Sequence, residues 1–273
     1  MTLLTFFRAA PAAAAGEAAA SPLARDAALR DQMQRLSQLR VFFGHQSVGV
    51  NLLDGLRTEA ARLGVPLRII EYGTGKSLSE PGIVHVAAGQ NGDPLGKVHH
   101  FAALLDAGAG AQAQVAAVKL CYVDFSPATD PAALFEAVKK ERAGMHARHP
   151  NLALLYVTAP LTTVQGGLKG ALKNTFGSGA AGVRENVLRQ RFNQLVRADA
   201  AATGAPLFDL AEAEAGSGVE RCAFEHGGEQ IPCLRPGITD DGGHLNARGR
   251  AELAGVFAEA LVAAAATLPP TVR

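Results

Sequence analysis

Short apolar runs alternate with amphipathic helical segments along most of this chain. The apolar runs predict buried strands at 40–44, 67–70, 115–122, 152–158 and 206–209. Apolar residues at helical spacing predict helices at 22–38, 48–63, 96–107, 131–146, 183–202 and 246–266. Because the strands are apolar throughout rather than alternating, both faces of their sheet should be covered. The pattern therefore predicts an α/β protein with a parallel sheet between helices.

Three connections in this pattern are long and rich in glycine, at 72–96, 159–182 and 215–243. Connections of this length inside a compact domain are usually functional or mobile. All three follow the carboxyl ends of predicted strands, which is where parallel sheets bind their ligands. We expect the functional site at that edge. No internal repeat or domain boundary interrupts 22–273, so this range is expected to form a single domain.

Composition excludes several classes of protein. With 48% hydrophobic and 19% charged residues, the 273-residue chain can bury a core. A net charge of +1 and the lack of a basic run give no indication of nucleic-acid binding. No segment has the length and apolarity of a membrane span, so none is expected.

The N-terminus and the cysteines bear on localisation. Residues 1–21 are apolar and then alanine-rich, which fits either a degenerate export signal or a disordered tail. Cys222 and Cys233 lie in one loop and could form a disulfide or remain free, while Cys121 ends a predicted strand as a small buried side chain. A periplasmic or secreted location is slightly favoured over the cytoplasm.

Ser47 lies at the junction between the first predicted strand and the helix that follows it. Free N–H groups and the positive end of a helix dipole can activate a hydroxyl there and stabilise an oxyanion beside it. From this stretch alone, Ser47 is either a helix N-cap or a nucleophile. His45, two residues earlier, either contacts substrate or makes a structural hydrogen bond.

A second polar cluster, Thr239 to Gly249, leads into the last predicted helix. Two glycines separate Asp241 from His244, so a turn can bring the carboxylate onto the Nδ1–H of the imidazole. The other ring nitrogen, Nε2, then faces outward as the general base that a serine nucleophile needs. Asp240 is an alternative acid, although the spacing favours Asp241.

The run Asp241-Gly-Gly-His244-Leu-Asn, with a glycine three residues later, resembles the last motif of the SGNH/GDSL hydrolases. The resemblance covers roughly 40–265. It implies a flavodoxin-like, three-layer α/β/α sandwich with a five-stranded parallel sheet. It also implies a catalytic triad of Ser47, His244 and Asp241 that needs no metal and no organic cofactor.

The chain departs from that family's other motifs. His45-Gln46 precedes Ser47 where the family has Gly-Asp. The family's Gly-x-Asn-Asp segment aligns with 121–124, where Val123 replaces the asparagine and only Asp124 matches. The family's asparagine is an oxyanion donor, so its loss affects the expected oxyanion hole.

The expected oxyanion hole therefore draws on other residues. The Ser47 N–H, the Gly89 N–H and the Asn91 side chain are its candidate donors, with His45 and Asp124 beside the substrate. Gly89 and Asn91 come from the long connection at 72–96. Losing one donor typically costs about 3 kcal/mol of transition-state stabilisation.

These residues predict a serine ester hydrolase that forms an acyl-enzyme. We expect its partner to be a glycan or small-molecule ester, with a small acyl group such as acetyl; its oligomeric state is open. The alternative is a non-catalytic or carbohydrate-binding domain of the same fold, which the departures at His45-Gln46 and Val123 favour. The Gly-x-Ser-x-Gly elbow of the α/β-hydrolases fits less well, because Gly44 lies one residue too far from Ser47.

Overall fold

A parallel sheet forms the centre of the computed structural model, which describes residues 21–73, 78–164 and 182–269. Residues 1–20 of the predicted tail or export signal lie outside these ranges, as does most of the connection at 159–182. Within the described ranges the sheet has six strands in the order β2-β3-β1-β4-β5-β6. They are β1 (Arg40–His45), β2 (Ile69–Glu71), β3 (Gly82–Ala87), β4 (Val115–Val118), β5 (Ala153–Val157) and β6 (Leu207–Phe208).

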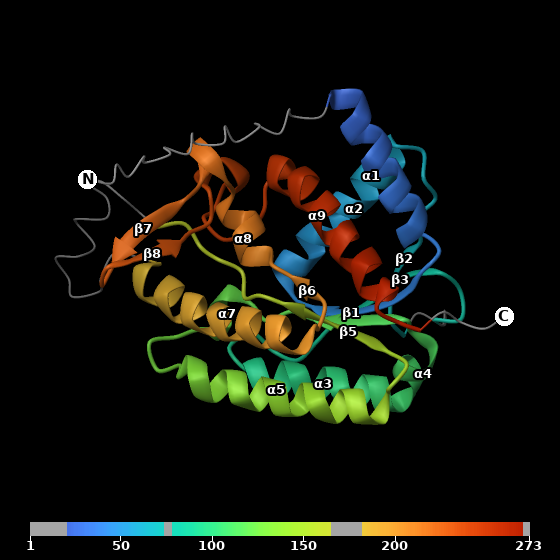
Figure 1. Ribbon diagram of the computed structural model, residues 1–273, viewed down its shortest axis with the longest axis horizontal. Coiled ribbons are helices and arrows are strands. Elements are labelled where there is room, and N and C mark those ends of the chain that lie inside the picture. Colours follow the sequence, from blue (N-terminus) through green and yellow to red (C-terminus); the bar gives the residue numbers. More distant parts are fainter. Residues whose placement is uncertain (1–20, 74–77, 165–181, 270–273) are drawn as a thin grey trace, which may run out of the picture.

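Helices cover both faces of this sheet (Figure 1). One layer contains α1 (Pro22–Leu36), α2 (Ser47–Arg62), α8 (Leu210–Ala215) and α9 (Ala247–Ala266). The other contains α3 (Pro94–Leu104), α5 (Pro131–Arg148) and α7 (Val183–Thr203). A π-helical turn (Leu105–Ala109) and the short α4 (Gly110–Gln112) follow α3, and the 3-10 turn η2 (Tyr122–Asp124) follows β4. The predicted three-layer α/β/α sandwich is confirmed.

Neighbouring phenylalanines of β1 show why its sequence does not alternate. Phe43 points into one layer and packs against Phe257 of α9, with 5.1 Å between ring centroids. Phe42 points into the other and stacks on Phe101 of α3 at 5.2 Å. Both faces of the strand are buried, so both sets of side chains are apolar.

The sheet has one strand more than the five that were predicted. The additional strand, β3, lies within 72–96, which was predicted to be a loop. It pairs in parallel with β1 on one side and with β2 on the other. Its six residues lie between Pro81 and Gly89. These two residues favour turns, so the short strand between them was not recognised. Without the three-residue edge strand β2, the strand order is the 2-1-3-4-5 of flavodoxin-like folds.

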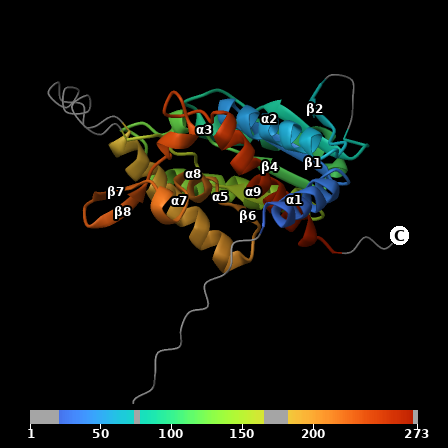
Figure 2. The ribbon, with the colours of Figure 1, turned by 90° about the horizontal axis from the view of Figure 1, so that it is seen from above.

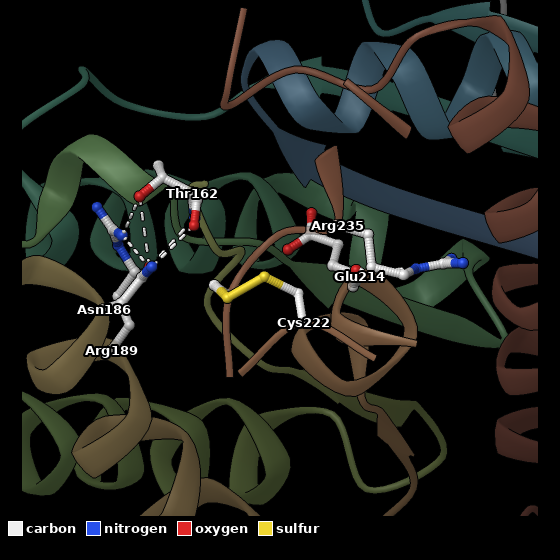
Figure 3. Close-up of a disulfide and its surroundings, with 7 residues drawn as sticks. Thr162, Asn186, Arg189, Glu214, Cys222 and Arg235 are labelled. Carbon is white, nitrogen blue, oxygen red and sulfur yellow. Dashed lines mark hydrogen bonds between the residues drawn. A yellow bond between two sulfur atoms is a disulfide. The ribbon is translucent and has the colours of Figure 1, made fainter. Parts of the chain in front are cut away.

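The predicted loop at 215–243 contains an antiparallel hairpin of β7 (Ala223–His226) and β8 (Glu229–Pro232). Gly227 and Gly228, both with positive φ, form the two-residue turn that such a hairpin favours. A disulfide between Cys222 and Cys233 closes the base of the hairpin (Figure 3). The hairpin lies at the opposite end of the molecule from α1 (Figure 2). Among the described helices, none is long and apolar enough to cross a membrane.

Candidate active site

Four segments meet at the carboxyl edge of the sheet. The side chain of Gln46 donates to the carbonyls of Ala88 and Gly89, which joins the start of α2 to the loop after β3. That loop is joined to η2 because the Gly92 N–H donates to Asp124. The turn η2 contacts the loop before α9 through Tyr122 and His244. The candidate residues from both ends of the chain therefore belong to one connected region.

Ser47 is the first residue of α2, and Gln46 occupies the N-cap position in an extended conformation. Among the described residues, neither the Ser47 hydroxyl nor its backbone N–H has a hydrogen-bond partner. Ser47 therefore does not act as the cap that its position first indicated. Its N–H belongs to the unsatisfied first turn of the helix, where partial positive charge accumulates.

One face of α2 lies along the segment that follows His244. Asn51, one turn beyond Ser47, accepts a hydrogen bond from the Leu245 N–H at 3.0 Å. Gly55, a further turn on, lies against the carbonyl of Arg250, so that a Cβ there would come within 2.2 Å of the oxygen. Residues four apart share a helix face, so Ser47 lies on the face of α2 that contacts the chain at Leu245 and Arg250.

Asp241 and His244 form a close pair. The His244 Nδ1–H donates to one carboxylate oxygen of Asp241 at 2.6 Å. The other oxygen accepts the backbone N–H groups of His244 and Gly243, at 2.8 and 2.9 Å. These bonds hold the pKa of Asp241 well below its usual range, and the backbone N–H of His244 is the largest cause. Asp240 instead accepts from Asn246, so Asp241 is the acid that orients His244.

The two glycines between this pair have separate geometric tasks. Gly242 has a φ of +88°, which side-chain-bearing residues rarely adopt. Gly243 lies under the ring of Tyr122, where an added Cβ would come within 2.9 Å of the ring carbon Cζ. The turn therefore brings Asp241 onto His244 and also lets Tyr122 approach the imidazole closely.

Tyr122 is the site residue that sequence reasoning missed. Its hydroxyl lies 3.3 Å from His244 Nε2, and the two rings meet edge to face at 5.6 Å. Since Nδ1–H is donated to Asp241, we assign Nε2 as the acceptor and the tyrosine hydroxyl as the donor. Within the described residues, no hydrogen bond joins the Ser47 hydroxyl to Nε2. A lone tyrosine just after a strand has no spacing signal that could have identified it.

A buried arginine fixes the turn that carries Tyr122. Two guanidinium nitrogens of Arg189 donate to the Tyr122 carbonyl, at 3.2 and 2.8 Å. The third donates to Asn186 at 2.6 Å and to the Thr162 hydroxyl at 3.0 Å (Figure 3). Burial lowers the pKa of Arg189 to about 10, so the side chain stays charged at neutral pH. Helix α7 thus positions Tyr122 from beneath.

Asp124 belongs to a buried ion pair rather than to the surface of the site. Both its carboxylate oxygens lie 2.6 Å from the Lys97 ammonium, and neither side chain is exposed. Asp124 also accepts the Gly92 N–H, and the Lys97 ammonium donates to the amide oxygen of Asn91 at 3.0 Å. The ion pair therefore anchors the loop after β3. Because Lys97 binds the amide oxygen of Asn91, this contact does not use the amide N–H groups.

Gly89 adopts a φ of +56°, and its N–H donates to His100 Nδ1 at 2.9 Å. Its carbonyl accepts from Gln46 at 2.8 Å. To bind an oxyanion, the N–H would first have to leave the His100 imidazole.

His45 lies under α2, with only 3% of its surface exposed. Its Nδ1–H donates to the Gln46 carbonyl at 2.9 Å, and its Nε2 accepts from His85 Nδ1 at 3.1 Å. Burial is the main cause that lowers the pKa of His45 to about 4. The residue is neutral and has no free nitrogen for a substrate. In the described part of the chain, His, Cys, Asp and Glu side chains form no group of three suited to a metal ion.

Comparison with known proteins found similar solved structures but no matching family. No protein-family model matches the chain, and no curated protein does. Solved structures similar to it include TesA, at 13% identity over 82% of this chain and 99% of that one, with a TM-score of 0.47. A Parabacteroides merdae protein assigned as a GDSL-like lipase is 11% identical over 81% and 94% of the two chains, with a TM-score of 0.45. A peptidoglycan O-acetylesterase is 14% identical over 70% and 49%, with a TM-score of 0.44. The chemistry of the site is therefore inferred from its own residues.

Proposed function

We propose that this protein is a serine ester hydrolase of the SGNH/GDSL type. Ser47 Oγ attacks the ester carbonyl while His244 Nε2 accepts its proton, and Asp241 orients the imidazole and stabilises its charged form. The proton then passes to the departing alcohol and leaves an acyl group on Ser47. Water, activated by the same histidine, releases the acid and restores the serine.

The Asp241–His244 pair is the observation that carries this proposal. The 2.6 Å contact is a charge-assisted hydrogen bond, and it fixes the tautomer in which Nε2 can act as a base. Two backbone N–H groups hold the carboxylate in place before substrate arrives. The face of α2 that carries Ser47 is turned to the same segment, as the Asn51–Leu245 bond indicates. Such preorganisation is what general-base catalysis requires.

The oxyanion of the intermediate would be stabilised at the start of α2. The Ser47 N–H is one donor, since it belongs to the unsatisfied first turn of the helix. The Asn91 amide is a second, because Lys97 binds only its oxygen. Gly89 can contribute a third donor once its N–H is released from His100.

An open site favours a bulky alcohol and a small acyl group. The side chains of His244 and Asp241 are 38% and 57% exposed, so a large alcohol such as a carbohydrate can approach them. We propose short acyl esters, of acetyl type, on a carbohydrate or small molecule. The Cys222–Cys233 disulfide supports an oxidising, extracytoplasmic location.

The test is hydrolysis of 4-nitrophenyl acetate by the wild type and by Ser47→Ala. Loss of a triad nucleophile typically lowers kcat by 10⁴-fold or more, so that loss is expected here. Ser37→Ala, at the end of α1 and the opposite edge of the sheet, is the matched control and should retain activity. Labelling of Ser47 by a fluorophosphonate reports the nucleophile independently. Equal activity in wild type and Ser47→Ala would falsify the proposal.

A binding protein without turnover is the second candidate. It is favoured by the contact of Nε2 with Tyr122, because no hydrogen bond joins Nε2 to the Ser47 hydroxyl in the described residues. Such a protein would bind acetylated glycans, measured by calorimetry, without hydrolysing them. It would also fail to react with the fluorophosphonate, whereas the hydrolase reacts at Ser47.

A further inference from the structure

Tyr122 is held in one position from three sides. Arg189 donates to its backbone carbonyl, and its ring rests on Gly243. Its turn is closed by the Cys121 N–H, which donates to the Asp124 carboxylate at 2.7 Å. The ring also packs against the apolar core beneath α2 and α9. Its hydroxyl therefore stays beside the imidazole of His244 rather than moving with solvent.

The two groups are close enough for a single oxygen atom to contact both. The Tyr122 hydroxyl and His244 Nε2 are 3.3 Å apart, so an oxygen atom can lie within about 3 Å of both at once. Two oxygens approach Nε2 during the proposed reaction. One is Ser47 Oγ, which gives up its proton, and the other is the alcohol oxygen, which receives it.

The Tyr122 hydroxyl is a donor at neutral pH. Burial is the main cause that raises the pKa of this phenol above its ordinary value, and the negative charge of Asp241 raises it further. The proton therefore stays on the phenol. In the free protein it is donated to Nε2, and once Nε2 is itself protonated the hydroxyl must find another acceptor.

We propose that Tyr122 is a catalytic residue that donates a hydrogen bond to the alcohol oxygen as it leaves. This inference rests on the proposed esterase function. When the tetrahedral intermediate collapses, the bond from carbon to the alcohol oxygen breaks and its electron pair stays on that oxygen. The oxygen takes the proton from His244 Nε2 and, at the same time, accepts the hydrogen bond from the Tyr122 hydroxyl. The phenol keeps its own proton throughout.

This role selects a class of substrate. A 4-nitrophenolate ion spreads its charge over its ring and leaves without assistance. The alkoxide of an aliphatic or sugar alcohol holds its charge on one oxygen, where a second donor is most effective. Tyr122 therefore suits esters of unactivated alcohols, such as a glycan hydroxyl.

The experiment compares leaving groups in wild type and Tyr122→Phe. The values of kcat/KM are measured for 4-nitrophenyl acetate, phenyl acetate and ethyl acetate. A hydrogen bond to a charged oxygen corresponds to a roughly 10- to 100-fold effect. We expect that loss for ethyl acetate, a smaller one for phenyl acetate, and a change of less than about threefold for 4-nitrophenyl acetate. Tyr156→Phe is the matched control, since its hydroxyl donates to Asp199 on α7 and touches no site residue.

Two results would overturn the inference. An equal loss for all three esters would mean that the hydroxyl positions His244 rather than assisting departure. No loss for any ester would mean that the hydroxyl takes no part. Both outcomes leave the proposed function intact if Ser47→Ala is inactive, whereas equal rates for wild type and Ser47→Ala would remove both proposals together.

Discussion

Two histidines of this protein make the same pattern of hydrogen bonds and are suited to opposite tasks. His244 donates from Nδ1 to Asp241 and accepts at Nε2 from Tyr122. His45 donates from Nδ1 to the Gln46 carbonyl and accepts at Nε2 from His85. The acceptor at Nδ1 is an ionised carboxylate in the first case and a neutral amide oxygen in the second.

That difference in acceptor, together with burial, decides what each ring can do. A carboxylate stabilises the imidazolium that forms when Nε2 takes a proton, and an amide carbonyl does so far less. His244 is 38% exposed and can exchange protons with a substrate, while His45 is 3% exposed and its pKa is lowered to about 4. Distance from Ser47 along the chain is therefore a poor guide to which histidine can act as a base. His45, the nearer one, is buried and makes structural hydrogen bonds.

The largest expected effect comes from removing the exposed histidine. His244→Ala should lower kcat for 4-nitrophenyl acetate by about 10⁴-fold or more, because Ser47 loses its base. Its thermal midpoint should remain close to that of the wild type, since the ring is partly exposed. His146→Ala, an exposed histidine on α5, is the control for the substitution itself. A His244→Ala enzyme with wild-type kcat would show that the base lies elsewhere.

Asp241→Asn should have the next largest effect. The amide cannot stabilise an imidazolium and can hold the ring in the wrong tautomer, so kcat should fall by about 10²- to 10⁴-fold. Asp240→Asn is the matched control, because Asp240 only accepts from Asn246. Rates of 4-nitrophenyl acetate hydrolysis measure both variants. If Asp240→Asn were the slower variant, the carboxylate that we assign to His244 would be the wrong one.

The sequence was sufficient for the features that depend on local pattern. Apolar runs identified most strands of the sheet, and the two glycines between Asp241 and His244 predicted the turn that pairs them. β3 was missed because its six residues lie in a glycine-rich stretch, and the length of that stretch made a loop the simpler interpretation. A local pattern identifies a strand reliably only where the residues around it do not themselves predict a loop.

The contacts that complete the site join residues far apart in the chain. Tyr122 and His244 are 122 residues apart, and no local pattern indicates that their rings meet. Asp124 matched a family motif, yet Lys97 lies against it and directs it inward. The Gly89 N–H was expected to be an oxyanion donor, yet it donates to His100. Such partners are set by packing between elements, which spacing within one element does not encode.

The buried histidine should govern acid stability rather than catalysis. The folded pKa of His45, about 4, lies below the ordinary value of 6.5, so between these values only the unfolded chain binds the proton. The free energy of unfolding is therefore unaffected by His45 protonation above pH 6.5, and it decreases as the pH falls from 6.5 toward 4. His45→Asn should cost about 2 kcal/mol at pH 7, through lost packing and hydrogen bonding, and should flatten the acid dependence.

Thermal midpoints from pH 4 to pH 8 measure that dependence, with His146→Asn as the exposed control. An unchanged acid slope in His45→Asn would mean that His45 is not the group responsible. A large loss of kcat at an unchanged midpoint would instead assign His45 to the reaction.

The smallest expected effect comes from His85, which donates a hydrogen bond to Nε2 of the buried His45. His85→Leu removes the N–H that His45 Nε2 accepts, so the free energy of unfolding should fall by about 1 kcal/mol. That change corresponds to a thermal midpoint about 2–4 °C lower for a protein of this size. His85→Asn can keep a donor near the same point and should lose less.

His85→Leu and Tyr122→Phe each remove one donor to the Nε2 of a histidine, so the two variants form a matched pair. The first should change stability and leave the rate of ethyl acetate hydrolysis unchanged, whereas the second should slow that reaction and leave stability unchanged. If His85→Leu slowed hydrolysis as Tyr122→Phe does, the buried pair would be coupled to the reaction. The acceptor at Nδ1 would then no longer explain why His244, and not His45, is the proposed base.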